Sequence, residues 1–307
     1  MKMSQLLRRC PLLAFWLVLL CCFWFWPGAA QADVGPKPSV VVEFLGMEQE
    51  TFYATLLSAT ESTGPYSVPD PQQAAAYAAG QTEEDVIQRQ FLSYQDEDGF
   101  HYLQFWQDCS GGQPFRWTYY PPREYKLLLY FPEQNQFVCS EIYQRYAFDS
   151  YYQLDAAGEK LSAMLTSGSI ASAAFSKHYD YTTEIWSLLA RIVLTILLEM
   201  LLALCFGFRG KKQLALLAGV NIATQVGLNV ALNIVNYYQG QMAFVLLYFA
   251  LELLICLVEA LVYAKWLGSL GADGQKHTAK TVAYAILANV FSFGAGMALA
   301  YYLPGIF

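Results

Sequence analysis

Three glutamates stand inside long apolar stretches of this sequence, where an ionised carboxylate is costly. Glu252 and Glu259 lie in the run FALELLICLVEALVYAKW, and Glu199 lies in LLEMLLALC. A charged side chain at the centre of a bilayer costs about 3 kcal/mol or more, so these carboxyls should face a protein interior and be hydrogen-bonded or protonated. The chemistry that such groups can perform is the binding of a proton or a cation.

Polar residues in the neighbouring apolar stretches extend this predicted site. Glu252 and Glu259 are seven residues apart, which places them on nearly the same helix face, about 10 Å apart along the axis. Glu199 and Glu252 fall near the middle of their stretches and form the predicted centre, whereas Glu259 lies nearer the cytoplasmic end, where it can reach water. The predicted mid-membrane polar cluster is Arg191, Glu199, Gln225, Asn229, Glu252, Glu259 and Asn289.

Two interpretations of these polar residues stay open. The amides of Asn221, Gln225 and Asn229 can bind a carboxyl in either protonation state, because an amide both donates and accepts. The same residues can simply hold helices together, since interhelical hydrogen bonds contribute roughly 0.6–2 kcal/mol each. Arg191 can pair with a carboxylate inside the bundle or extend its long side chain outward to the membrane surface.

The residues needed for common catalytic sites are missing from the apolar stretches. The three histidines, His101, His178 and His277, all lie outside them. The sequence has no His-Glu-x-x-His motif, and its cysteines have no metal-binding spacing. We therefore predict a protein that is not an enzyme and that needs neither a metal nor another cofactor.

Composition and hydropathy predict a multi-pass membrane protein. The chain has 307 residues, of which 56% are hydrophobic and 14% charged, whereas soluble proteins are about 25% charged. Stretches at 185–208, 214–235, 242–264 and 281–303 are each long enough to cross a bilayer as a helix. They predict an antiparallel four-helix transmembrane bundle.

Basic residues are confined to alternate connections between these four stretches. The first and third connections carry Lys and Arg, whereas the second, NYYQGQ, carries neither. Lys and Arg are enriched in cytoplasmic loops. The pattern therefore predicts a plasma-membrane protein whose segment before the bundle and whose C-terminus both lie on the extracytoplasmic side. The basic residues are Arg209, Lys211, Lys212, Lys265, Lys276 and Lys280.

The first 32 residues predict an export signal. Lys2, Arg8 and Arg9 precede a long apolar run that ends in GAAQA at 28–32. A basic start, an apolar middle and a small-x-small ending predict a signal peptide over 1–32, cleaved after Ala32. An uncleaved signal anchor is the alternative, because the apolar run is long and rich in Trp and Phe.

Residues 33–180 predict an exported β-rich domain. This segment has 20 acidic and 8 basic residues and no apolar run long enough to span a membrane. Short β-branched and aromatic runs between turn-forming clusters predict an antiparallel sandwich or a small antiparallel sheet, with one helix. The predicted strands are 39–44, 51–57, 101–106, 115–119, 125–131 and 136–143. The helix is predicted over 82–92 with Thr82 as N-cap, and 64–80 is predicted to be an irregular loop.

Two cysteines fall in this predicted domain. Cys109 and Cys139 would lie on the oxidising side of the membrane, where a disulfide can persist. One disulfide and two free thiols are both compatible with the sequence. The predicted function does not depend on which of the two forms.

The exported segment opens with DVGPKPS at 33–39 and continues with STGP at 62–65, YFP at 130–132 and YAFDSYY at 146–152. Together with FGFR at 206–209 and the Asn-rich second apolar stretch, it resembles a group of uncharacterised bacterial membrane proteins. These have a signal peptide, an exported domain starting DxGPKPS and four C-terminal transmembrane helices. The resemblance covers essentially the whole mature chain. It implies this architecture and a bacterial origin, and it implies no activity and no site residue.

These observations lead to two functional hypotheses. The first is a non-enzymatic accessory or sensory membrane protein whose acidic domain binds an extracellular ligand or partner. The second is a small oligomeric transporter or channel that uses the mid-membrane carboxylates to couple to protons or cations. The expected partners are the lipid bilayer and either another protein or further copies of this chain, and no nucleic acid.

Overall fold

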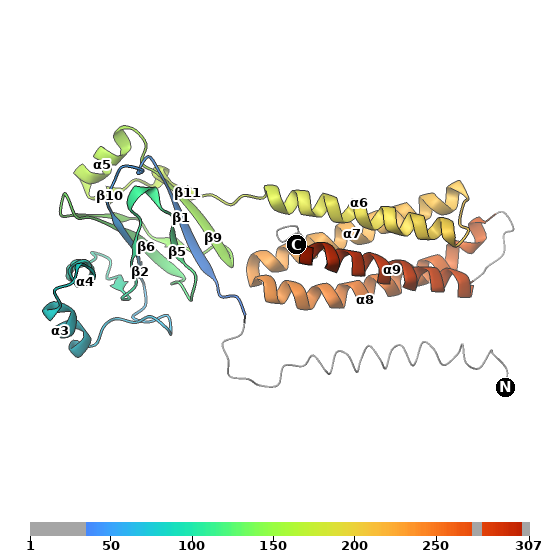
Figure 1. Ribbon diagram of the computed structural model, residues 1–307, viewed down its shortest axis with the longest axis horizontal. Coiled ribbons are helices and arrows are strands. Elements are labelled where there is room, and N and C mark those ends of the chain that lie inside the picture. The colour runs from blue at the N-terminus through green and yellow to red at the C-terminus, as the bar shows by residue number, and fades with distance from the viewer. Residues whose placement is uncertain (1–34, 272–277, 303–307) are drawn as a thin grey trace. The chain divides into compact units, whose positions relative to one another are not determined.

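The computed structural model describes residues 35–271 and 278–302, except for the side chains of 183, 184, 187 and 297–302. It contains a β-rich region at 36–177 followed by a helical region at 182–302 (Figure 1). The predicted signal peptide at 1–32 lies outside the described residues.

The β-rich region contains two sheets. Its strands are β1 (Ser39–Leu45), β2 (Tyr53–Ser58), β3 (His101–Tyr102), β4 (Gln107–Asp108), β5 (Phe115–Trp117), β6 (Glu124–Phe131), β7 (Gln136–Ser140), β8 (Tyr143–Gln144), β9 (Asp149–Asp155), β10 (Ser169–Ile170) and β11 (Phe175–Lys177). One sheet has the order β11-β9-β1-β5. The other has the order β10-β7-β6-β2-β3, with β4 beside β2 and β8 beside β6.

The pairing of these strands is mixed. β1 pairs with β9 in parallel, and β10 pairs with β7 in parallel, whereas the remaining described pairs are antiparallel. The prediction of antiparallel pairing is therefore wrong at these two pairs. Parallel neighbours need a long crossover, and the chain supplies one by running through most of the second sheet between β1 and β9.

Alternating residues of the strands form the main core. On β1, Val40, Val42 and Phe44 are buried in this core together with Leu127 and Leu129 of β6. The alternation is expected because successive side chains of a strand point to opposite faces. Trp117, Phe52 and Phe131 are also fully buried in it. The residues predicted as strands 39–44 and 125–131 thus supply the centre of the fold.

A helix covers the opposite face of the second sheet. Helix α4 (Glu83–Ser93) packs Ile87 and Phe91 onto Leu57, Leu128 and other apolar side chains of that sheet. Its N-cap is Thr82, whose hydroxyl accepts the N–H of Asp85 at 3.1 Å. This confirms the helix and the N-cap that the sequence predicts. Because α4 covers one face and the core the other, nearly all of β6 is buried.

Two further helices of the β-rich region were not predicted. Helix α3 (Pro71–Ala79) lies inside 64–80, for which the sequence predicted an irregular loop. Pro71 occupies its first turn and Asp70 accepts the N–H groups of Gln72 and Gln73 at 2.8 Å, a combination that favours a helix start. Helix α5 (Glu159–Ser167) follows β9.

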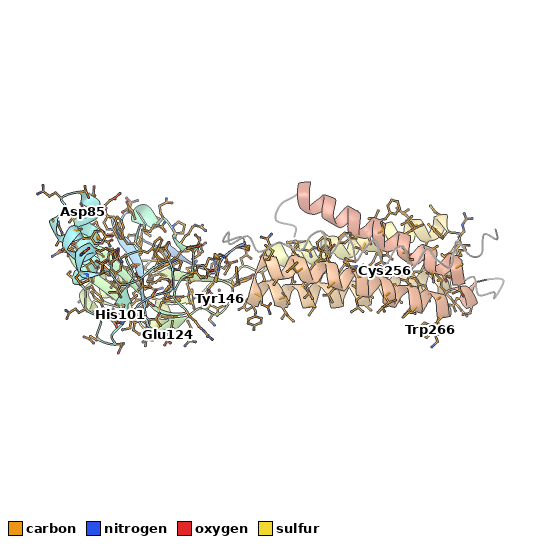
Figure 2. All side chains as sticks on the ribbon, turned by 90° about the horizontal axis from the view of Figure 1, so that it is seen from below. Asp85, His101, Glu124, Tyr146, Cys256 and Trp266 are labelled. Atoms are coloured by element: carbon orange, nitrogen blue, oxygen red, sulfur yellow. The ribbon has the colours of Figure 1, made fainter. Side chains whose placement is uncertain are left out.

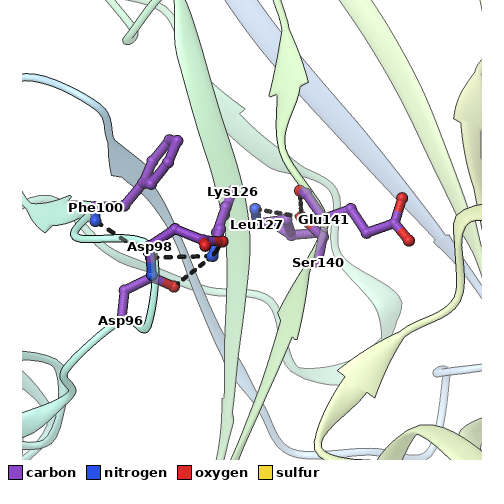
Figure 3. A network of polar contacts seen from close by, with 7 residues as sticks. All are labelled: Asp96, Asp98, Phe100, Lys126, Leu127, Ser140 and Glu141. Carbon is purple, nitrogen blue, oxygen red and sulfur yellow. Dashed lines mark hydrogen bonds and ion pairs between the residues drawn. The ribbon is translucent and has the colours of Figure 1, made fainter.

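Lys126 on β6 is charged and buried. Its Nζ donates to Asp96 at 2.8 Å and forms an ion pair with Asp98 at 2.6 Å (Figure 3). Asp96 also accepts the backbone N–H of Phe100 at 3.2 Å. Burial is the largest single influence on the pKa of Lys126 and lowers it, but the hydrogen bonds to Asp96 and Asp98 and the negative charge of Asp96 together raise it by more, so the net shift is upward. The loop that follows α4 is thereby fixed to the sheet.

The two cysteines of this region are free thiols. Cys109 is buried in the main core, whereas Cys139 packs with the aromatic cluster under α4. They are therefore on different faces of the second sheet, which answers the open question of a disulfide in favour of two thiols. Burial raises the pKa of each thiol above its ordinary value.

Four long helices make up the helical region. They are α6 (Thr182–Cys205), α7 (Lys211–Gln239), α8 (Gln241–Trp266) and α9 (Thr278–Tyr302). α6 contacts α7 and α9, and α8 also contacts α7 and α9. Three of these helices, α6, α7 and α8, contain segments long and apolar enough to cross a membrane. For α9 the crossing stays a prediction, because the side chains of 297–302 are outside the described set.

The helical region exposes apolar side chains and buries polar ones. On α6, Leu189, Val193, Leu197 and Leu201 follow one another at four-residue spacing and are all exposed. Trp266 is exposed at the end of α8 (Figure 2). Lipid is the environment in which such an outer surface is stable, while internal helical hydrogen bonds satisfy the backbone.

We expect Lys126→Met to destabilise the β-rich region by about 3 kcal/mol, because it leaves the buried Asp96 carboxylate without its cation. Thermal unfolding of the purified full chain in detergent, followed by near-ultraviolet circular dichroism, measures the change. Lys160→Met is the matched control, since the Lys160–Asp155 ion pair is exposed and such pairs contribute about 0–1 kcal/mol. Equal effects of the two substitutions would contradict a structural role for the buried pair.

Candidate functional site: two polar layers between the helices

Polar side chains from all four helices meet in a layer near the C-terminal ends of α6 and α8. Glu199 and Glu259 supply two carboxyls, of which about 1% and 0% of the residue surface is exposed. We call this group the carboxyl layer. Its members are Glu199 on α6, Asn221 and Thr224 on α7, Glu259 and Tyr263 on α8, and Asn289 on α9.

Glu259 is held by donors from two neighbouring helices. The Thr224 hydroxyl of α7 donates to Oε1 at 2.8 Å, and the Asn289 amide of α9 donates to Oε2 at 2.7 Å. Each carboxyl oxygen therefore accepts one hydrogen bond across a helix interface. Because Glu259 is fully buried, the expectation that it reaches water at the membrane surface is wrong.

Glu199 is held from α7. Asn221 Nδ2 donates to Glu199 Oε2 at 2.7 Å and also lies 3.2 Å from the hydroxyl of Tyr263. The hydroxyl of Tyr284 on α9 donates to the backbone oxygen of Glu199 at 3.0 Å. Asn221 and Thr224 are three residues apart on α7, so one face of that helix serves both carboxyls.

Equal distance from the helix ends explains why Glu199 and Glu259 share a layer. Glu199 stands six residues before Cys205 and Glu259 seven before Trp266, the last residues of α6 and α8. At 1.5 Å per residue both lie about 10 Å from those ends. The predicted span 185–208 put Glu199 at mid-helix, but α6 ends at Cys205 and Gly207 turns the chain with a φ of 80°.

A second polar group lines a small cavity between the helices. Arg191 of α6 donates from Nη1 to Asn229 Oδ1 at 3.2 Å, and its guanidinium lies 5.7 Å from the ring centre of Phe244. Arg191 therefore points to the helix interior, which decides against the alternative of an outward side chain. The cavity is lined by Arg191, Leu194, Thr195, Gln225, Leu228, Asn229, Tyr248, Glu252, Ser292 and Gly296.

Glu252 belongs to this cavity and not to the carboxyl layer. It lines the cavity with Arg191 and Tyr248, whereas Glu199 does not line it. The space open to water-sized spheres is about 20 Å³, and one water molecule needs about 10–15 Å³. The predicted pairing of Glu199 with Glu252 is therefore corrected: Glu199 shares the carboxyl layer with Glu259, and Glu252 lines the cavity that Arg191 also lines.

The structure thus divides the predicted cluster into two groups. Glu199, Glu259 and Asn289 lie in the carboxyl layer, and Arg191, Gln225, Asn229 and Glu252 line the cavity. Acid–base binding of a proton is the chemistry open to the first group, and hydration or the binding of a very small ligand is open to the second. Within the described part of the chain, no three His, Cys, Asp or Glu residues are arranged to hold a metal ion.

Three tyrosines contribute to these sites and were not predicted. Tyr263 belongs to the carboxyl layer, Tyr284 contacts that layer, and Tyr248 lines the cavity. Spacing could have indicated two of them, because Tyr263 follows Glu259 by four residues and Tyr248 precedes Glu252 by four, which places each pair on one helix face. Tyr284 has no such signal, since it contacts a backbone oxygen of another helix.

Comparisons of this chain with protein-family models, with curated proteins and with solved structures gave no match.

We expect Asn289→Leu to destabilise the helical region by about 1–2 kcal/mol, because it removes an amide donor from the buried carboxyl of Glu259. Denaturant unfolding of the full chain in bicelles measures the loss. Val290→Leu on the same helix is the matched control, since Val290 is exposed and should change stability by less than about 0.5 kcal/mol. A loss for Asn289→Leu no larger than that of the control would contradict the assigned contact.

Proposed function

We propose that this chain is a bacterial plasma-membrane protein whose acidic β-rich region lies outside the cell and acts as a non-enzymatic accessory or sensory module. In this proposal the helical region anchors that module as an antiparallel four-helix transmembrane bundle. The supporting observation is the inverted polarity of the helices, with apolar side chains exposed and carboxyls and amides buried. Such polarity suits an anchor in lipid.

The packing inside the helical region favours a role as a membrane anchor over a role as a transporter or channel. Both carboxyls of the carboxyl layer are engaged by amide or hydroxyl donors from neighbouring helices. The cavity beside Arg191 has room for one or two water molecules only. A bundle of this kind holds its helices in one register and leaves binding to the β-rich region.

Charge supports the orientation and suggests the partner. Basic residues lie at the ends of the helices in alternate connections, with Lys211 and Lys212 starting α7 and Lys265 ending α8, whereas Gly240 alone joins α7 to α8. This distribution favours an outward β-rich region. Residues 33–180 carry 8 basic and 20 acidic side chains, a net charge of −12, which favours a partner with a cationic surface.

Photo-crosslinking in intact cells tests this proposal. A photoreactive residue at Val86 or Ile142, two exposed apolar positions of the β-rich region, should form a discrete adduct with a second protein. A protease added outside the cells should digest that adduct. The control position is Lys212, which is exposed and lies on the proposed cytoplasmic side.

The crosslinking result has clear contrary outcomes. Protection of the β-rich region from external protease would contradict the orientation. An absence of adducts at both Val86 and Ile142, or the same adduct at Lys212, would contradict a role in binding an extracellular partner.

A second function is favoured by one observation, the placement of Glu252 and Arg191 around a cavity that admits water. An oligomer of this chain could use this site to couple to protons or cations. Reconstituted vesicles would then show proton or cation flux that Glu252→Gln abolishes and that Leu254→Val, at an exposed position of α8, leaves unchanged. An absence of flux with the unmodified protein would exclude this function.

A further inference from the structure

Glu199 and Asn221 form a pair with two acceptor atoms left over. Asn221 Nδ2 donates to Glu199 Oε2 at 2.7 Å, and both residues are about 1% exposed. The remaining oxygens of the same two groups, Glu199 Oε1 and Asn221 Oδ1, are buried and have no hydrogen-bond partner among the described residues. Two acceptors without a donor are unfavourable in a buried site, most of all if one of them is charged.

Glu259 in the same layer shows the opposite pattern. Its Oε1 accepts from the Thr224 hydroxyl and its Oε2 from the Asn289 amide. An ionised carboxylate only accepts hydrogen bonds, whereas a protonated carboxyl donates one. The donors around Glu259 therefore suit an ionised group, and the unused acceptors around Glu199 suit a group that carries a proton.

We propose that Glu199 is protonated and donates its proton from Oε1 to Asn221 Oδ1, while Glu259 stays ionised. A carboxylic acid and a primary amide then share two hydrogen bonds, one in each direction, and both unused acceptors are satisfied. The carboxyl layer is in this view a binding site for one proton, formed by two carboxyls. The O–H bond forms when the Glu199 carboxylate takes up a proton, which changes the charge of the layer from −2 to −1.

The surroundings of Glu199 favour the proton at this position. From α8 it is faced by the charge of Glu259 and, less strongly, that of Glu252. Two like charges close together in a buried site disfavour the ionisation of both. The other titratable neighbours are Cys256 and Tyr263 on α8 and Tyr284 on α9. α7 contributes Asn221 and Thr224. The hydroxyl of Ser292 on α9 donates to Asn289 O and also faces the Glu199 carboxyl, where it opposes the proton more weakly than the charges of Glu259 and Glu252 favour it.

This inference does not depend on the proposed function. A neutral Glu199 serves an anchor by removing a buried charge, and it serves a transporter by holding a proton. The proton is the ligand in both cases, and the residue that carries it is the same.

Infrared difference spectroscopy of the full chain in lipid vesicles tests the assignment. At neutral pH the unmodified protein should show the C=O stretching band of a protonated carboxylic acid, with the small shift that exchange into heavy water produces. Glu199→Gln should remove that band, whereas Glu259→Gln and Glu252→Gln should retain it. Glu199→Gln should still fold, because the glutamine amide can donate to Asn221 Oδ1 and accept from Nδ2 as the acid does.

The spectra decide the proposal in every case. Loss of the band in Glu199→Gln alone supports it, and any other pattern, including the absence of the band in the unmodified protein, overturns it. If Glu199→Gln fails to fold, Asn221→Leu decides instead. That substitution removes the hydrogen bond to the acid carbonyl and should move the band to higher frequency, and an unmoved band overturns the proposal.

Discussion

The helical region depends on the hydrogen bonds that bring buried carboxyls together with amides and hydroxyls of neighbouring helices. A carboxyl on an apolar helix has no favourable state in lipid unless other helices supply its partners. Glu259 is contacted from α7 and α9, and Glu199 from α7. These contacts set which turns of the helices face each other, a choice that apolar packing alone leaves weakly determined.

In the β-rich region, too, a buried charged side chain is placed together with its hydrogen-bonding partners. Lys126 would be unfavourable on a covered face of the sheet, and it is placed there with Asp96 and Asp98 as partners. Around it, the core is made by the alternating side chains of β1 and β6 and by aromatic contacts such as Phe44 with Phe52. In both regions a buried charge is accompanied by its partners, and apolar contacts supply the remaining stability.

Local sequence signals predicted part of the fold. Thr82 before an acidic turn correctly marked the start of α4, and the aromatic and β-branched runs correctly marked β1 and β6. The parallel pairing of β1 with β9 was out of reach, because it joins residues more than 100 positions apart. Helix α3 was missed because its prolines suggested a loop, although Asp70 and Gln73 form a capping box.

The polar residues of the helical region were predicted by type, but their partners were not. Polar residues stand out in an apolar sequence, which is why they could be predicted by type. All seven predicted residues lie either in the carboxyl layer or at the cavity. Which carboxyl meets which depends on where each helix ends. The predicted end of α6 lay three residues beyond Cys205, the observed end. This error paired Glu199 with Glu252 instead of Glu259. The contact between Tyr284 and a backbone oxygen leaves no trace in the residue pattern.

A double-mutant cycle between Glu259 and Asn289 tests the central claim, that carboxyl–amide contacts between helices hold this region together. The unfolding free energies of Glu259→Leu, Asn289→Leu and the double variant would be measured in bicelles, because neither leucine can form the hydrogen bond between the two side chains. We predict a coupling energy of about 1–2 kcal/mol for this pair. The cycle between Glu252 and Asn289 should be additive within about 0.5 kcal/mol. Additivity between Glu259 and Asn289 would contradict the account.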